Sequence, residues 1–186
     1  MAIILASQSP RRKELLGYLV PEFQVLPADI DETIQAADVP EEYVLRMARE
    51  KARAIAKTHP NDLVIASDTI VVVQNKILGK PASREEAFEM LASMSGATHQ
   101  VYTAVVMCSN DTIKERIVPA NVTFFALTEA EINHYLDQEE YQDKAGAYGI
   151  QGKASVFVQR VDGDYYSIVG FPVGVVNQML KEFTEV

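Results

Sequence analysis

The chain has 186 residues, 48% of them hydrophobic and 23% charged, which is enough for the core of one domain over residues 1–186. Its formal net charge of −9 at pH 7 argues against nucleic acid or a membrane surface as a partner, so an anion site requires a local cluster of cations. The single cysteine, Cys108, excludes an internal disulfide. The apolar runs are too short for a signal peptide or a membrane helix, so we expect a cytoplasmic protein.

The first half of the chain predicts strands that alternate with helices. Strands are expected at 2–6, 23–26 and 63–73, and helices at 10–19, at 40–57 and from Ser83 onward, with a polar loop at 29–38. The first helix has a clear start, because Ser9 is a suitable N-cap and Pro10 fits the first helical position. Residues 74–79 read as a turn followed by a short partner strand.

The second half predicts hairpins and two helices. Strands are expected at 101–108, 117–125 and 156–161 and again after a turn at 162–163, and helices at 128–136 and 172–183. The two long strands would be joined by a polar turn at 109–112. Thr128 and Glu131 have the spacing of a capping box. The expected fold class is therefore α/β with a mixed β-sheet and flanking helices.

The stretch LASQSPRRKELL places two arginines at the start of a helix. Arg11 and Arg12 lie where the helix dipole disfavours cations, so they weaken the helix unless an anion binds there. Helical spacing aligns them with Leu15 and Leu16, on the face that packs against the sheet. Surface arginines with buried stems are the alternative reading.

Two lysines are further candidates for an anion site. Lys51 is in register with the apolar face of its helix, where a lysine whose stem is buried at the edge of the core is the commoner explanation. Lys80 lies in a Gly-Lys-Pro turn and is unremarkable alone. Both could join an anion site if the fold brings them to it.

Asp68 interrupts the apolar strand LVIASDTIVVV. A carboxylate in such a run is costly unless it has a partner. A hydrogen-bond network or an ion pair would satisfy it, and a role as metal ligand or general base would also explain it. Asp31 and Glu32 are further carboxylates, in a polar loop where exposure to solvent is the default.

The loop DKAGAYGIQG, residues 143–152, has a glycine at every third position. It is not a dinucleotide-binding fingerprint, because it neither follows a strand nor opens a helix. The sequence also lacks GxxxxGK[ST], HExxH and GxSxG. A P-loop, a zincin-type metal site and a serine-hydrolase elbow therefore have no support.

Together these stretches resemble the Maf family of nucleoside triphosphate pyrophosphatases. The matching segments are LASQSPRRKELL, DIDE, REKARA, SDT, GKP, YTAV and DKAGAYGIQG, in family order over most of the chain. Within the family, SDT with DKAGAYGIQG looks like the branch that acts on dTTP and UTP.

The resemblance implies hydrolysis of a nucleoside triphosphate between its α and β phosphates. It also implies an elongated fold with two lobes around a cleft, similar to inosine triphosphate pyrophosphatases, a divalent cation (Mg²⁺ or Mn²⁺), and an oligomer that is often a homodimer. Asp68 would be the base and would share the metal with Glu32. The residues implied to bind substrate are Ser7, Arg11, Arg12, Glu32, Lys51, Thr69, Lys80 and Gln151.

Gln151 has the chemistry to select the base. Its carboxamide offers an acceptor and a donor that complement N3–H and O4 of uracil and thymine. A bond to a backbone turn among the glycines is the alternative for this side chain. A non-catalytic nucleotide-binding regulator of septum formation is the alternative for the whole protein.

Overall fold

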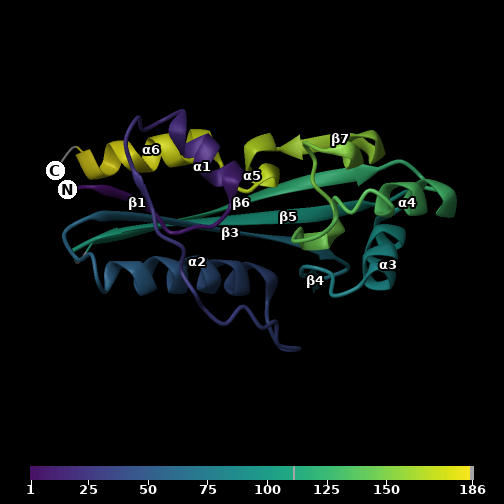
Figure 1. The fold of residues 1–186 in the computed structure, drawn as a ribbon, viewed down its shortest axis with the longest axis horizontal. Helices are drawn as coiled ribbons and strands as arrows, with labels where there is room; N and C mark the ends of the chain where they lie inside the picture. The colour runs from purple at the N-terminus through teal and green to yellow at the C-terminus, as the bar shows by residue number, and fades with distance from the viewer. Residues whose placement is uncertain (111, 185–186) are drawn as a thin grey trace.

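The computed structural model describes residues 1–110 and 112–184 and shows a mixed α/β fold (Figure 1). The strands are β1 (Ile3–Leu5), β2 (Gln24–Val25), β3 (Leu63–Val73), β4 (Lys76–Leu78), β5 (Thr98–Ser109), β6 (Thr112–Phe124) and β7 (Val158–Gly163). The helices are α1 (Pro10–Gly17), α2 (Pro40–Ala56), α3 (Arg84–Met94), α4 (Glu129–Leu136), α5 (Tyr165–Val169) and α6 (Val173–Thr184), with 3₁₀ turns η1 (Ala145–Ala147) and η2 (Lys153–Phe157). Within the described ranges, no helix combines the length and apolarity needed to cross a membrane.

The seven strands form one sheet in the order β2-β1-β3-β5-β6-β7, with β4 beside β3. β1 runs parallel to β2 and β3, and the remaining pairs are antiparallel. This confirms the expected mixed sheet. Figure 1 shows an elongated molecule in which the long strands β3, β5 and β6 run most of its length.

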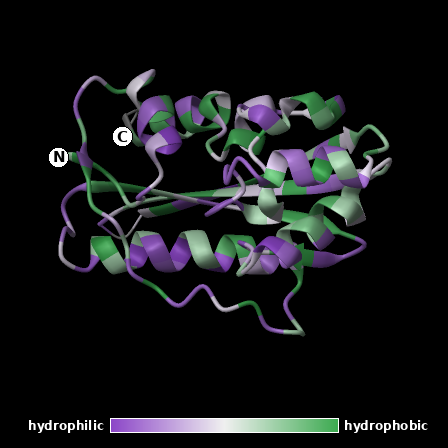
Figure 2. Cartoon of the chain, turned by 45° about the vertical axis from the view of Figure 1, so that its right-hand side comes forward, coloured by the Kyte–Doolittle hydropathy of each residue, from purple (hydrophilic) through white to green (hydrophobic). Residues whose placement is uncertain are grey.

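The sheet separates two apolar layers. One contains α2 together with sheet residues such as Val64, Ala66 and Ile70, and we call this side of the sheet the α2 face. The other contains the apolar residues of α1, α3, α4, α5 and α6 with sheet residues such as Ile65 and Val71, and we call this side the α1 face. Alternation along β3 thus sends even-numbered residues to the α2 face and odd-numbered residues to the α1 face. Apolar residues line the central strands, whereas the helices carry both polar and apolar residues (Figure 2).

β3 has a gap along one edge. β1 pairs with it only from Leu63 to Ile65, and β4 only from Val71 to Val73. Over residues 66–70, β5 pairs with β3 on one side, and no strand of the described residues pairs on the other. The two faces of the sheet can therefore meet beside this segment.

Most predicted elements are present, and two differ after residue 155. The strand expected at 156–161 is β7, which begins at Val158 because η2 occupies the residues before it. The strand expected after Gly163 is instead the short helix α5. The Asp164 side chain caps this helix by accepting from Tyr166 N and Ser167 N, and Gly170 ends it in the left-handed region. The turn expected at 109–112 includes Asp111, which lies outside the described residues.

Candidate active site

The Ser67-Asp68-Thr69 segment of β3 lies in the gap between β1 and β4. Asp68 belongs to the even series and points to the α2 face, whereas Ser67 and Thr69 point to the α1 face. Ser67 and Asp68 are both buried. Three consecutive residues thus present polar groups on both sides of the sheet.

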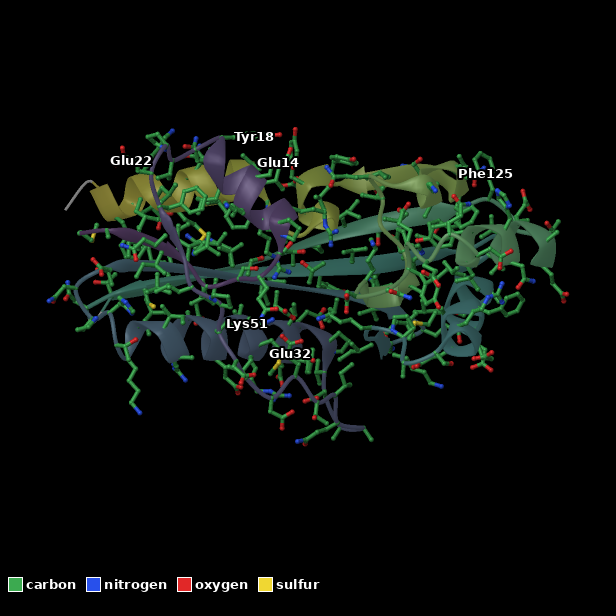
Figure 3. All side chains as sticks on the ribbon, viewed as in Figure 1. Glu14, Tyr18, Glu22, Glu32, Lys51 and Phe125 are labelled. Atoms are coloured by element: carbon green, nitrogen blue, oxygen red, sulfur yellow. The ribbon has the colours of Figure 1, made fainter. Side chains whose placement is uncertain are left out.

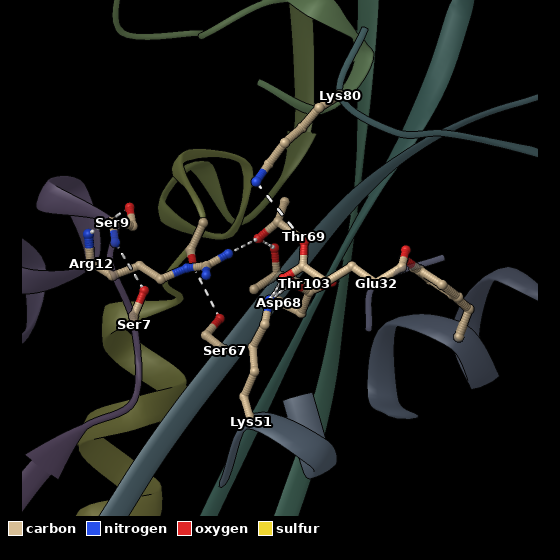
Figure 4. Close-up of polar contacts among 12 residues, drawn as sticks. Ser7, Ser9, Arg12, Glu32, Lys51, Ser67, Asp68, Thr69, Lys80 and Thr103 are labelled. Atoms are coloured by element: carbon tan, nitrogen blue, oxygen red, sulfur yellow. Dashed lines mark hydrogen bonds and ion pairs between the residues drawn. The ribbon is translucent and has the colours of Figure 1, made fainter. Parts of the chain in front are cut away.

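On the α2 face, Lys51 joins two carboxylates. Its Nζ lies 2.6 Å from Asp68 Oδ1 and 2.6 Å from Glu32 Oε1 (Figure 4). Lys51 is itself buried, on the side of α2 that packs against the sheet, and Figure 3 shows it close to Glu32. Lys80 Nζ approaches Glu32 Oε2 at 3.9 Å. The structure therefore brings together Glu32, Lys51, Asp68 and Lys80, and their roles in binding and catalysis stay predictions.

Glu32 reaches this cluster from the loop that precedes α2, and its side chain remains 43% exposed. Partial burial raises its pKa, but the hydrogen bond from Lys51 and the charges of Lys51 and Lys80 outweigh that effect and leave the pKa below its ordinary value. Tyr43 on α2 donates its hydroxyl to the Glu32 backbone carbonyl at 2.8 Å, which fixes the loop at this residue.

On the α1 face, Arg12 is held by neutral acceptors. Its Nε donates to the Gly170 carbonyl at 2.9 Å, and its Nη2 donates to Thr69 Oγ1 at 3.2 Å. Burial is the largest influence on this guanidinium and leaves its pKa below the ordinary value, against the opposing effect of the Asp68 charge. Arg12 is thus a partly buried cation whose direct partners carry no charge.

The start of α1 offers further donors to an anion. Ser9 caps the helix by accepting from Arg12 N, and Ser7 Oγ accepts from Ser9 N at 3.1 Å. Ser7 is buried, and the first turn contains no acidic residue. Pro10 has no N–H and Arg12 N is bonded to Ser9, so this terminus offers a phosphate the N–H of Arg11 and the positive end of the helix dipole.

Arg11 lies near a cation that the sequence reasoning missed, Lys144. Burial lowers the pKa of Lys144, and the charge of Arg11 lowers it further. The Lys144 Nζ donates to the Glu140 carbonyl, and its stem lies so close to Gly149 that a Cβ there would be 2.8 Å from Cε. The signal in the sequence was the lysine of DKAGAYGIQG, the stretch in which only glycine spacing was considered.

The loop DKAGAYGIQG, residues 143–152, contacts the α1 face next to Lys80. Gly146 N donates to the Gly79 carbonyl at 3.1 Å, next to Lys80. Gly146 has φ +66°, and a Cβ there would be 2.9 Å from the Val71 side chain, so both backbone conformation and space require glycine. Gln151 is exposed, and within the described part of the chain no hydrogen bond or ion pair connects its side chain to the cluster. Base recognition by Gln151 stays a prediction.

The sequence also did not predict the residues that hold Thr69 and Gly170 in place on the α1 face. Thr103 Oγ1 lies 2.8 Å from Thr69 Oγ1 and donates to the Ser167 carbonyl at 2.6 Å. Ser67 Oγ donates to the Gly170 carbonyl at 3.0 Å. Thr69 and Thr103 are opposite each other in the β3–β5 register. No pattern in the sequence indicates these partners, because long-range pairing creates all of these contacts.

The chemistry of the carboxylates suits a hard divalent cation. Mg²⁺ is commonly bound by one or two carboxylates together with water and substrate phosphates, and Asp68 and Glu32 supply two such groups. No cluster of three His, Cys, Asp or Glu residues able to hold a metal occurs among the described residues. The residues present therefore fit a metal that shares its coordination with a phosphate ligand.

A family model and two curated relatives identify the family of this chain, and a solved structure shares its fold. The family model described as Maf-like protein matches residues 2–183. A protein of Latilactobacillus sakei subsp. sakei (strain 23K) named dTTP/UTP pyrophosphatase is 46% identical over 178 residues, which cover 96% of this chain and 98% of the relative. A protein of Bacillus mycoides (strain KBAB4) with the same name is 48% identical over 181 residues, which cover 97% and 95%. A HAM1 protein from Coxiella burnetii shares the fold, with a TM-score of 0.53, 16% identity and coverage of 98% of this chain and all of that chain (100%).

Proposed function

This chain belongs to the Maf-like family, and on that premise we propose that it hydrolyses nucleoside triphosphates, dTTP and UTP in preference, to the monophosphate and pyrophosphate. The observation that carries the proposal is the distribution of charge on the two sides of β3. Arg12 on the α1 face has neutral partners, whereas Lys51 on the α2 face bridges two carboxylates. One side is therefore suited to an anion, and the other to a water molecule and a cation.

The triphosphate binds on the α1 face, at the start of α1. Arg12 has guanidinium N–H groups beyond the two that it uses on Gly170 and Thr69. Arg11 adds donors from its side chain and its backbone N–H. Lys80 approaches the same gap from the turn after β4. A polyanion in this position compensates the charge of Arg12, whose direct partners are neutral.

Asp68 acts as the general base on water. Lys51 bonds to Oδ1 of its carboxylate, which leaves Oδ2 to accept the proton as the water attacks the α-phosphorus. The ion pair with Lys51 gives the buried carboxylate a partner of opposite charge. Phosphoryl transfer depends mainly on positioning and on compensation of charge, and the fixed strand β3 supplies the positioning.

Asp68 and Glu32 would hold a divalent cation, Mg²⁺ or Mn²⁺. When bound, this ion would neutralise charge on the phosphates during the attack. Support comes from the two carboxylates that converge on one point beside the gap.

Gln151 would read the base. The loop that carries it lies against the α1 face through Gly146 and Val71, the same face as Arg12. An exposed carboxamide in this loop can pair with N3–H and O4 of uracil or thymine.

We place the reaction in the cytoplasm, in agreement with Cys108, which is a buried free thiol.

The test is pyrophosphate release from dTTP, UTP, CTP, ATP and GTP, each with and without Mg²⁺ or Mn²⁺. We expect release from dTTP and UTP, dependent on the added metal, and much less from the purines. Nucleotide binding without release of pyrophosphate from any of the five would contradict the proposal and favour the non-catalytic regulator.

A further inference from the structure

The ammonium group of Lys51 occupies the space between Glu32 and Asp68. Both N–O distances are 2.6 Å, so two of the three donors of this ammonium point at the oxygens that a metal ion would need. The side chain of Lys51 is 10% exposed and that of Asp68 13%, so solvent screens this ion pair little. Lys51 is therefore already the counter-ion of both carboxylates.

A divalent ion added to this group meets a strong opposing charge. Two carboxylates and one ammonium carry a net charge of −1, and the ammonium would lie beside the metal unless it moved away. Repulsion between two cations a few ångströms apart, beside the buried Lys51–Asp68 pair, offsets much of the attraction to the carboxylates. The free protein therefore has a weak site for a metal.

A triphosphate changes this balance. Its oxygens add negative charge beside Lys51 and supply the additional ligands that the protein lacks, because the described residues contain no group of three metal-ligating side chains. Lys51 can then turn from the carboxylates to a phosphate. Of its two partners, Glu32 is the one able to separate, because it lies in a loop and its side chain is 43% exposed, whereas Asp68 is fixed in β3.

We propose that Lys51 acts as an internal cation that keeps divalent metal from binding to the free protein, so that metal and nucleotide enter the site together. This inference rests on the proposed function for the identity of the incoming anion. It concerns the protein before nucleotide binds, and it is tested there.

The experiment is isothermal titration calorimetry of Mn²⁺ alone into wild-type protein and into Lys51→Met, without nucleotide. Lys51→Met removes the ammonium and retains an unbranched apolar stem. We expect this variant to bind Mn²⁺ at least about tenfold more tightly than the wild type. Equal or weaker binding by a folded Lys51→Met would overturn the proposal.

Lys80→Met is the matched control. Lys80 is 3.9 Å from Glu32 and its side chain is 59% exposed, so its removal should change Mn²⁺ affinity by less than about twofold. A gain as large as that of Lys51→Met would show a general effect of charge and would contradict the specific role of Lys51.

Two further variants keep the result interpretable. The double variant Lys51→Met, Asp68→Asn should lose the gain in affinity, and retention of the gain would place the new Mn²⁺ elsewhere and overturn the proposal. If Lys51→Met does not fold, Lys51→Gln replaces it, and the readout becomes the shift of the melting temperature by Mn²⁺. Pyrophosphate release is measured separately, so an inactive protein with the expected Mn²⁺ result would contradict the proposed function and leave the role of Lys51 supported.

Discussion

The cations on the two sides of β3 have different kinds of bonding partner. On the α2 face, Lys51 is bonded to two carboxylates. On the α1 face, Arg12 is bonded to a carbonyl and a hydroxyl. The charge is matched on one side and unmatched on the other, although the residues of β3 that face them, Asp68 and Thr69, are consecutive. Under the proposed function, the α1 face receives the phosphates and Asp68 on the α2 face accepts the proton.

The largest loss of activity should follow substitution of Asp68 on the α2 face. Asp68→Asn retains the shape and an acceptor for Lys51 but removes the base, so we expect kcat for UTP to fall by about 10³-fold. Nucleotide binding, measured by calorimetry, should persist because a negative charge leaves the site. Asp31→Asn, in the exposed loop before α2, is the control and should retain its activity. An Asp68→Asn enzyme with near-normal turnover would remove Asp68 from the mechanism.

Substitution of Arg12 on the α1 face should mainly weaken binding of the substrate phosphates in the transition state. Arg12→Ala removes charged donors from the phosphates and should lower kcat/KM by about 30- to 10³-fold, which corresponds to a loss of about 2–4 kcal/mol. It should also lower the melting temperature, because the bonds to Gly170 and Thr69 are lost. Lys13→Ala, which removes an exposed cation from the next position of α1, is the control. If both variants lose activity equally, the general charge of the helix matters and the specific donor does not.

At low pH, protonation of His99 should add to the α1 face a second positive charge whose direct hydrogen-bond partner, as for Arg12, is neutral. His99 on β5 is buried with Nε2 2.7 Å from the Tyr148 hydroxyl, and its Nδ1 has no hydrogen-bond partner among the described residues. Burial lowers the pKa of His99 from 6.5 to about 4. The unfolded chain therefore takes up a proton first as the pH falls below 6.5, and the free energy of unfolding should decrease until the pH reaches about 4, by about 2 kcal/mol between pH 7 and pH 5.

Urea unfolding of the wild type and His99→Gln at the two pH values measures this effect. The neutral amide does not titrate in this range, so His99→Gln should lose much of the acid sensitivity of the wild type. His134→Gln changes an exposed histidine of α4 and should retain that sensitivity. The same pH dependence in all three proteins would assign the acid effect to groups other than His99.

The smallest effect should concern base choice on the α1 face. Gln151→Ala should lower kcat/KM for UTP and dTTP by about tenfold, which corresponds to one or two neutral hydrogen bonds. Its preference for these nucleotides over CTP should become weaker. Gln142→Ala, in the same segment of the chain and exposed, provides the comparison. Equal losses for every nucleotide would mean that Gln151 shapes the loop without contacting the base.

The sequence was most informative where local chemistry decides the structure. Caps such as Ser9 and Thr128 begin helices where predicted, and polar residues that interrupt apolar patterns, Lys51 and Asp68, do meet. The residues after Gly163 were misread as a strand, because Tyr-Tyr-Ser-Ile-Val favours a strand by composition whereas the Asp164 cap produces a helix. Glu32, Thr103 and Gly170 acquire their roles from contacts between distant segments, which no local pattern encodes.

The alternation along β3 has a consequence for how the gene can change. Asp68 serves one face and Thr69 the other only while each keeps its odd or even place counted from Leu63, where pairing with β1 begins. Deletion of one codon between these points would turn the carboxylate toward Arg12 and the hydroxyl toward Lys51. Substitutions in this strand can therefore be graded in effect, whereas insertions and deletions of a single residue would invert the site, and length variation is expected in loops such as the one before α2.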